Sequence, residues 1–304
     1  MCYRINKMIN KLKFCIVVNV NAKGNKKLLN QIINLLKNDH DVEIYESKST
    51  STAEEIFKDL SFKMFDRLVI AGGDGSFNFA INKILQHSSS LLKKDIGYIP
   101  TGTTNILQIE TRIQKNAKVI AKVLIGRNTR KINLSKINEQ YFFLMAGIGF
   151  DGKIVASVDK GIKKYLGKGA FVLKGFWHFL FLNNKKIEVL FDNKKIQADW
   201  VLSTNSRYYA GRFVVTKTTN IFQNDLVTYI FKDLTRIKIL YYILTIVFCG
   251  DLSKAKNVIT TRSKHIKINK LNMDLVAQVD GELFDSKNKI EILQTAQFIN
   301  LLTT

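Results

Sequence analysis

The sequence predicts an α/β protein in which an N-terminal parallel-sheet α/β domain is followed by a C-terminal antiparallel β-sandwich domain. Three observations support this fold class. Strand and helix patterns alternate over the first part of the chain, many short strands follow from about Thr129, and 304 residues are enough for two hydrophobic cores. We therefore expect domains over residues 1–129 and 130–285, with residues 286–304 packing back on the first domain.

The N-terminal part alternates short apolar runs with helical patterns. Strands are expected at 14–20, 41–46, 66–71 and 95–100. Between them, 26–38, 52–64 and the segment after Gly75 carry apolar residues at helical spacing, such as Leu28, Ile32 and Leu36 in the first. This alternation predicts a parallel sheet with helices on both faces.

From Thr129 onward the pattern is one of short strands separated by turn signals such as DNKK, QND and DGE. Strands are expected at 131–137, 141–146, 186–191, 200–203, 227–231, 265–268 and 275–279. Such a series is typical of an antiparallel sandwich.

Charge and cysteine usage limit the classes of partner and compartment. Lys and Arg number 47 against 25 Asp and Glu, a net charge of +22 that favours anionic partners. The alternative is a composition bias that scatters lysine over the surface, since no helix carries a continuous basic stripe with interleaved aromatics. Nucleic acid is the weakest of the anionic partners, because charge alone supports it. The three cysteines, Cys2, Cys15 and Cys249, have neither a disulfide framework nor metal-ligand spacing, which suits a reducing, cytoplasmic compartment.

Two segments are strongly apolar, Phe171 to Leu182 and Ile239 to Gly250. Both are shorter than the ~18 to 20 residues that span a bilayer. The second is expected to be a buried or interfacial helix, so the sequence predicts a protein that touches a membrane without crossing it.

The stretch Gly72-Gly73-Asp74-Gly75-Ser76 lies between an apolar strand and a helical pattern. A turn that opens a helix directs backbone N–H groups and the positive end of the helix dipole to one point, where an anion binds well. Ser76 can cap the helix or donate its hydroxyl to a phosphate. Asp74 would repel a phosphate unless Mg²⁺ intervenes or the carboxylate handles a proton; the alternative is a plain turn with an aspartate cap.

A second turn, Ile99 to Asn105, also follows a strand and precedes a helix, and contains Gly102 and Thr103. The carboxyl ends of neighbouring parallel strands meet at one edge of the sheet, where open α/β folds bind ligands. Together the two turns predict a nucleotide site.

These two turns and three further segments resemble the diacylglycerol kinase catalytic-domain family, which includes sphingosine and ceramide kinases and bacterial lipid kinases. The five segments are GGDGSFNFAINKI, IPTGTTNILQIE, AGIGFDGKIVASV, NSRYYAGRFVVT and QVDGELF, in the order expected for the family. The resemblance implies a phosphofructokinase-like N-terminal domain, a nucleotide cleft between the two domains, ATP and Mg²⁺ as cofactors, and phosphorylation of a diacylglycerol-like or sphingoid hydroxyl.

The resemblance also assigns site residues. Glu282, in the Asp-Gly-Glu turn, matches the family's catalytic base, and Asp74 is expected to act with it and to contact the Mg²⁺ of the nucleotide. Asp280 and Asp151 match further acidic positions. The nucleotide-binding residues implied are Asn19, Gly24, Ser47, Gly72, Gly73, Asp74, Gly75, Ser76, Phe77, Asn78, Gly102 and Thr103. Lys23 and Lys26 would add positive charge there or remain solvated.

A structural Mg²⁺ loop of some bacterial members corresponds to Gln223 and Asp225, where Gln223 is a weaker ligand than aspartate. Phe79 and Ile106 replace acidic residues that other members carry. We expect an ATP-dependent lipid kinase that is cytoplasmic, binds an anionic membrane surface peripherally, does not bind nucleic acid, and is a monomer or a homodimer. The alternatives are a NAD kinase-type enzyme and a non-catalytic lipid or nucleotide sensor.

Overall fold

A computed structural model describes residues 11–21, 24–87, 91, 94–150, 152, 186–270, 275–286 and 289–304. Lys23, Asp151, Cys2 and the apolar segment 171–182 lie outside the described residues.

The N-terminal half contains four parallel strands in the order β2-β1-β3-β4. The strands are β1 (Lys13–Asn19), β2 (Asp41–Ser47), β3 (Arg67–Gly72) and β4 (Asp95–Pro100). The helices are α1 (Lys26–Lys37), α2 (Thr50–Leu60), α3 (Asp74–His87), α4 (Ile106–Thr111) and α5 (Ala117–Ile125).

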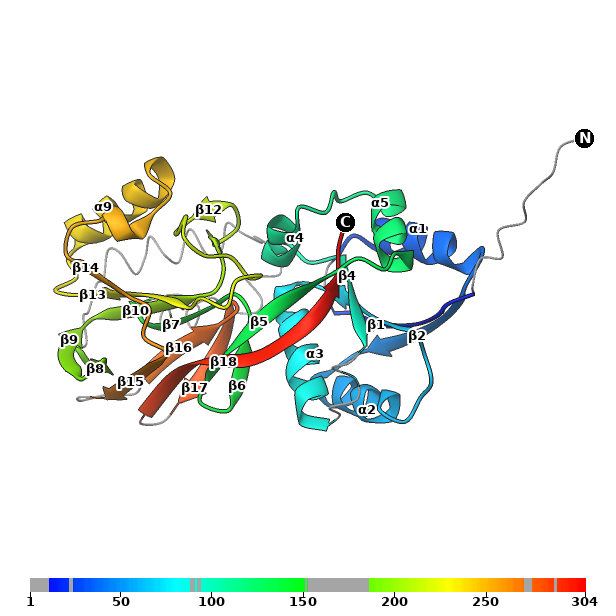
Figure 1. Cartoon of the computed structure of the whole chain (residues 1–304), viewed down its shortest axis with the longest axis horizontal. Helices are drawn as coiled ribbons and strands as arrows, with labels where there is room; N and C mark the ends of the chain where they lie inside the picture. The colour runs from blue at the N-terminus through cyan, green and yellow to red at the C-terminus, as the bar shows by residue number, and fades with distance from the viewer. Residues whose placement is uncertain are drawn as a thin grey trace, which may run out of the picture.

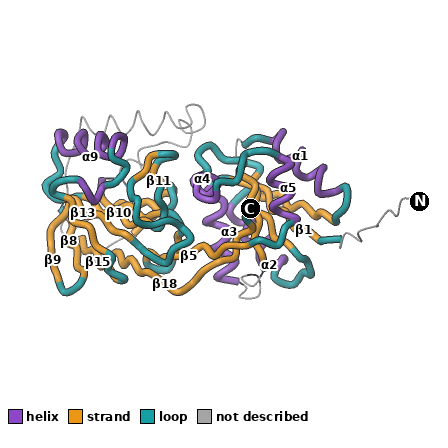
Figure 2. The backbone as a smooth tube through the Cα atoms, turned by 45° about the horizontal axis from the view of Figure 1, so that its top comes forward, coloured by secondary structure: helices purple, strands orange, loops and turns teal. Residues whose placement is uncertain are grey.

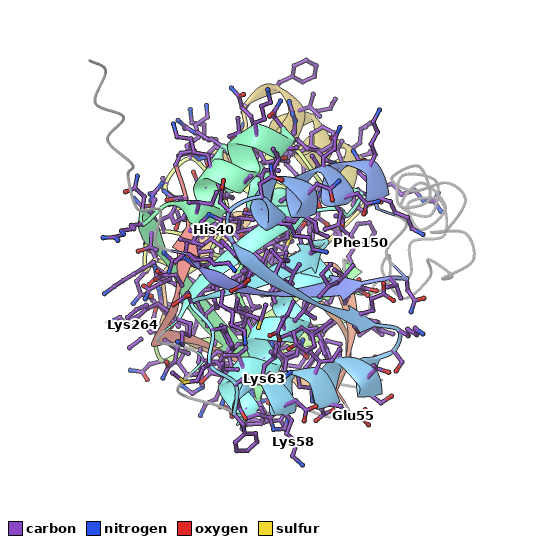
Figure 3. All side chains as sticks on the ribbon, turned by 90° about the vertical axis from the view of Figure 1, so that its right-hand side faces the viewer. His40, Glu55, Lys58, Lys63, Phe150 and Lys264 are labelled. Carbon is purple, nitrogen blue, oxygen red and sulfur yellow. The ribbon has the colours of Figure 1, made fainter. Side chains whose placement is uncertain are left out.

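Helices cover both faces of this parallel sheet. Side chains alternate along β1, so Phe14 and Ile16 pack in a cluster with α1 and α5, while Cys15 and Val17 pack in a cluster with α2 and α3. Figure 3 shows α1 and α5 above the strands and α2 below them. Polar side chains cap the helices; Asn25 accepts a hydrogen bond from Leu28 N, and Ser49 accepts one from Thr52 N.

The C-terminal half is a sandwich of two sheets. Its elements are β5 (Thr129–Ile137), β6 (Gln140–Phe142), β7 (Met145–Gly149), β8 (Ile187–Phe191), β9 (Lys194–Ala198), β10 (Trp200–Thr204), β11 (Tyr208–Tyr209), β12 (Phe213–Val214), β13 (Val227–Phe231), α9 (Arg236–Phe248), a 3₁₀ helix (Leu252–Lys254), β14 (Val258–Thr261), β15 (His265–Lys270), β16 (Leu275–Val279), β17 (Glu282–Ser286) and β18 (Lys289–Leu302). One sheet has the antiparallel order β14-β13-β10-β7-β16-β17. Buried aliphatic residues of this sheet, such as Ile148 and Ile230, pack against Ile266 and Ile292 of the other.

The long strand β18 belongs to both halves of the molecule. It pairs antiparallel with β15 and β5 in the sandwich, and Leu301 near its end pairs parallel with Ile96 of β4. Figure 1 shows β18, in red, running from the sandwich to the parallel strands, with the C-terminus beside β4. One sheet therefore continues from the N-terminal half into the C-terminal half.

The predicted fold class, a parallel α/β part followed by an antiparallel sandwich, is confirmed. Among the described helices, none is both long and apolar enough to cross a membrane. The predicted helix near Ile239 is α9, which has several exposed apolar side chains.

Candidate active site at the two glycine turns

The two glycine turns pack directly against each other at the carboxyl ends of β3 and β4. The backbone N–H groups of Thr101 and Gly102 both donate to the carbonyl of Gly72, at 3.0 and 3.2 Å. A Cβ atom at Gly102 would lie 2.5 Å from Cα of Gly73, so this approach requires glycine. The sequence predicted that these turns lie at one edge of the sheet, and in the structure their backbones are in contact.

Asp74 begins α3 but binds the other turn. Its Oδ2 accepts a hydrogen bond from Ile106 N at 2.7 Å, and its Oδ1 accepts one from Leu107 N at 3.0 Å. These are N–H groups of the first turn of α4, which have no partner within their helix. Burial raises the pKa of the Asp74 carboxyl to about 6, because desolvation outweighs the two hydrogen bonds, which lower the pKa by favouring the charged form. Asp74 is thus a cap, although for α4 rather than for its own helix.

The rim of the first turn is formed by β1 and the loop after it. Asn19 Nδ2 donates to Ser76 Oγ at 2.9 Å, which fixes the hydroxyl beside the turn. Gly24 lies against Thr101, where a Cβ atom would be 2.4 Å from the carbonyl oxygen. Ser47 pairs with Asn19 in the sheet and donates to the carbonyl of Ser49. The side chain of Thr103 is exposed at the second turn, and Lys26 is exposed at the start of α1.

Glu282 reaches the glycine turn from the opposite end of the sequence. It begins β17, directly after the turn at Asp280 and Gly281. A Cβ atom at Gly75 would lie 2.9 Å from Oε1 of Glu282 and 3.3 Å from its Cδ. The absence of a side chain at Gly75 therefore leaves the space in which the Glu282 carboxylate sits against the turn.

Asp280, two residues before Glu282, holds this hairpin in place. Its carboxylate is buried and accepts four hydrogen bonds: Oδ1 from Leu144 N and Met145 N, and Oδ2 from Phe143 N and Asn78 Nδ2. Burial raises its pKa to about 7, because desolvation outweighs these hydrogen bonds.

Phe77 and Asn78 point away from the turn. The Phe77 ring is fully buried, edge-on to Tyr98 and to Phe143 with ring centroids 5.3 Å apart in each pair. Asn78 donates to Asp280 and to the carbonyl of Tyr141. Their side chains therefore stabilise the junction between the halves and do not face the space in front of the glycines.

Two further links across this junction were not found from the sequence. Asn82 Oδ1 accepts a hydrogen bond from Tyr141 N at 2.8 Å. Glu110 on α4 is buried and accepts hydrogen bonds from Ser206 Oγ and Arg207 N, at 2.7 and 2.6 Å, and burial raises its pKa. These contacts join positions far apart in the chain, and no local pattern identifies them.

Phe79, which departs from the family pattern, is partly buried against the core, and Lys83 Nζ lies 5.6 Å from the centre of its ring. Ile106, the second departure, is buried and supplies one of the N–H groups that bind Asp74.

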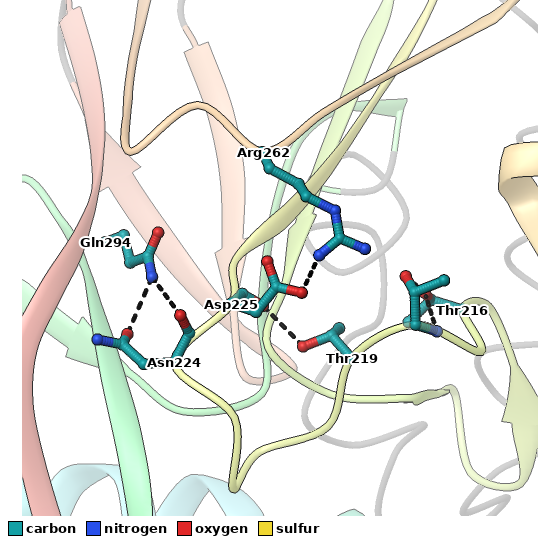
Figure 4. A network of polar contacts seen from close by, with 7 residues as sticks. Thr216, Thr219, Asn224, Asp225, Arg262 and Gln294 are labelled. Carbon is teal, nitrogen blue, oxygen red and sulfur yellow. Dashed lines mark hydrogen bonds and ion pairs between the residues drawn. The ribbon is translucent and has the colours of Figure 1, made fainter.

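The residues at the predicted structural Mg²⁺ loop do not fit a divalent cation. The Asp225 carboxylate is bound by the guanidinium of Arg262, and the Asp225 carbonyl accepts a hydrogen bond from Thr219 Oγ1 (Figure 4). Asn224 is held by Gln294 of β18, and Gln223 is exposed. Within the described part of the chain, no three His, Cys, Asp or Glu side chains gather into a metal site.

Known proteins with similar sequences and folds include bacterial diacylglycerol kinases. Residues 13–137 match the model of the diacylglycerol kinase catalytic domain. A diacylglycerol kinase of Staphylococcus epidermidis is 25% identical over 79% of this chain and 74% of its own length, and one of Bacillus subtilis is 25% identical over 78% and 80%. The crystal structure of a diacylglycerol kinase from Bacillus anthracis superposes with a TM-score of 0.74 at 21% identity, covering 97% of this chain and 98% of that one.

The fold and the paired glycine turns define an α/β protein in which the Glu282 carboxylate, from the second half, lies against the turn that opens α3. The match over residues 13–137 and the relatives named diacylglycerol kinase support the resemblance to the diacylglycerol kinase catalytic-domain family that the sequence indicated. The family match and the curated relatives support the predicted enzyme class, a lipid kinase.

Proposed function

We propose that this protein is an ATP-dependent lipid kinase that phosphorylates the hydroxyl of a diacylglycerol-like or sphingoid lipid at the cytoplasmic face of a membrane. The observation that carries the proposal is the Glu282 carboxylate lying against Gly75, inside the turn that opens α3. This arrangement brings together a carboxylate that can act as a base and a turn that can bind an anion.

In this proposal the phosphates of ATP bind at the glycine turn. The N-terminus of α3 presents backbone N–H groups and the positive end of a 14-residue helix dipole there. Ser76, held by Asn19, and the exposed Thr103 add hydroxyl groups. Because phosphoryl transfer depends mainly on positioning and on charge stabilisation, a rigid pair of turns suits this reaction.

Glu282 would act as the general base. It takes the proton of the lipid hydroxyl while the hydroxyl oxygen bonds to the γ-phosphorus and the bond from that phosphorus to the β-phosphate oxygen breaks. Asp280 would position this base, since its four hydrogen bonds fix the turn from which Glu282 projects.

Mg²⁺ would reach the site as Mg-ATP, where it neutralises phosphate charge. Both Asp74 oxygens already accept backbone hydrogen bonds, and the described residues include no acidic or histidine cluster that suits a metal. We therefore assign no step to a metal held by the protein alone.

Transfer of label from γ-labelled Mg-ATP to diacylglycerol, ceramide, a sphingoid base, a polyprenol and NAD tests this proposal. We expect labelled lipid, and a loss of about 10²- to 10⁴-fold in kcat for Glu282→Gln. Glu139→Gln, an exposed glutamate of the β5–β6 turn, is the matched control with unchanged rate. Labelled NADP would indicate a NAD kinase, and ATP binding without transfer would indicate a sensor; either result contradicts the proposal.

Gly75→Ala gives an independent test of the same contact. The three atoms nearest to the added methyl group would all belong to the flexible Glu282 side chain, so the fold should persist while the carboxylate is displaced. We expect thermal stability close to wild type with a large fall in kcat. Full activity in Gly75→Ala would show that the position of Glu282 in this structure is not the productive one.

A further inference from the structure

The outer face of α9 is apolar and exposed. The helix packs on the sandwich through Ile239, Tyr242 and Thr245. Facing outward, Ile237 and Phe248 are 82% and 78% exposed. The other exposed apolar residues of this helix are Leu240, Tyr241, Ile243, Leu244 and Val247. Figures 1 and 2 place α9 on the outside of the sandwich, at the opposite end of the molecule from α1.

Basic side chains surround this face. Arg236 at the start of α9 and Lys254 and Lys256 after it are exposed. The neighbouring β11–β12 hairpin, which contacts α9, adds Arg212 and the half-exposed ring of Phe213.

The two acidic groups at the ends of α9 already have partners within the chain. Asp233, just before α9, forms an ion pair with Lys186 at 2.7 Å. Asp251, just after the helix, is buried and caps the 3₁₀ helix by accepting hydrogen bonds from Ser253. The α9 face thus combines exposed apolar side chains with a basic margin.

We propose that the α9 face docks onto an anionic lipid bilayer, with α9 lying in the plane of the membrane interface. At 13 residues the helix is about 20 Å long, too short to cross the hydrocarbon core, but its apolar face and basic margin suit an interfacial helix. A second copy of the chain is a poorer occupant, because it brings the same basic margin and the same net charge of +22. This inference rests on the proposed function, since the acceptor lipid of a lipid kinase lies in such a bilayer.

Sedimentation with vesicles of phosphatidylcholine, with and without phosphatidylglycerol, tests the docking. We expect binding that requires phosphatidylglycerol and weakens with salt. Phe248→Glu should reduce the affinity by about tenfold or more, because one large apolar side chain leaves the interface. Phe62→Glu is the matched control, since Phe62 is 85% exposed at the end of α2, and it should bind like wild type.

Phosphorylation of a short-chain diacylglycerol dissolved in buffer separates the two hypotheses. Phe248→Glu should keep this activity and lose activity on vesicles. Equal vesicle binding by Phe248→Glu and wild type would overturn the docking proposal, as would a dimer, seen by light scattering, that Phe248→Glu dissociates. If wild type phosphorylates neither lipid but still binds vesicles through α9, the proposed kinase function is overturned and the docking proposal stands.

Discussion

The junction between the two halves and the α9 end differ in how polarity is distributed. At the glycine turns and the adjoining junction, three carboxyl groups, Asp74, Glu110 and Asp280, are buried, and each accepts hydrogen bonds from backbone N–H groups of another segment. At α9, large apolar side chains such as Ile237 and Phe248 are exposed. The difference indicates that the buried carboxylates are satisfied by hydrogen bonds within the chain, whereas the α9 face leaves large apolar side chains exposed, which is the basis of the docking proposal.

Removal of Asp280 should have the largest effect on the fold. Asp280→Ala leaves three backbone N–H groups and the Asn78 amide without their buried acceptor. We expect the free energy of unfolding in urea to fall by about 3 kcal/mol or more, because each unsatisfied buried group costs about 1–3 kcal/mol. Asp233→Ala, which removes an exposed carboxylate, should leave the free energy of unfolding close to that of wild type, because solvent screens its ion pair with Lys186. Similar losses in the two variants would mean that the junction does not depend on this carboxylate.

Disturbing the contact between the two glycine turns should cause the next largest loss of unfolding free energy. In Gly102→Ala the new methyl group would meet the backbone of Gly73, which cannot move aside easily, so we expect a loss of about 1–3 kcal/mol in unfolding free energy. Gly73→Ala is the matched control on the other side of this contact, because its Cβ would lie 3.4 Å from Cα of Gly102. Calorimetry that ranks the two variants in the reverse order would contradict this close approach of the two backbones.

The fold class and the glycine turns could be predicted from the sequence because both are local. Strand and helix periodicity, and glycine directly after an apolar run, are visible within about ten residues. The partner of Asp74 could not be predicted, since the carboxylate binds N–H groups of a helix 32 residues later. The pairing of Asn78 with Asp280 spans 202 residues and follows from the packing of the hairpin on α3. The resemblance indicated Glu282 as the base, but only the structure places it at Gly75.

Asp74 should also make stability depend on pH. Its folded pKa of about 6 lies above the ordinary value of 3.8, so the folded state binds more protons than the unfolded state between these values. The stabilising contribution of this proton is complete below about pH 4 and is lost as the pH rises through 6. The unfolding free energy of wild type minus that of Asp74→Asn should therefore decrease from pH 4 to 6 and level off above 7. A difference that increases over this range would show that the hydrogen bonds to Ile106 and Leu107 outweigh desolvation.

Removal of the Asp225–Arg262 pair should change the free energy of unfolding least. Unlike the buried carboxylates, which accept hydrogen bonds from backbone N–H groups, Asp225 pairs with a guanidinium and is partly exposed. The side chains of Asp225 and Arg262 are 26% and 49% exposed, so water and salt screen their attraction. Arg262→Ala should lower the free energy of unfolding by about 1 kcal/mol or less, and high salt should remove most of the difference. Since the guanidinium supplies the positive charge at this loop, a chelator should leave the melting temperature of wild type unchanged. A fall in the wild-type melting temperature on chelation, restored by Mg²⁺, would show that a metal rather than Arg262 neutralises Asp225.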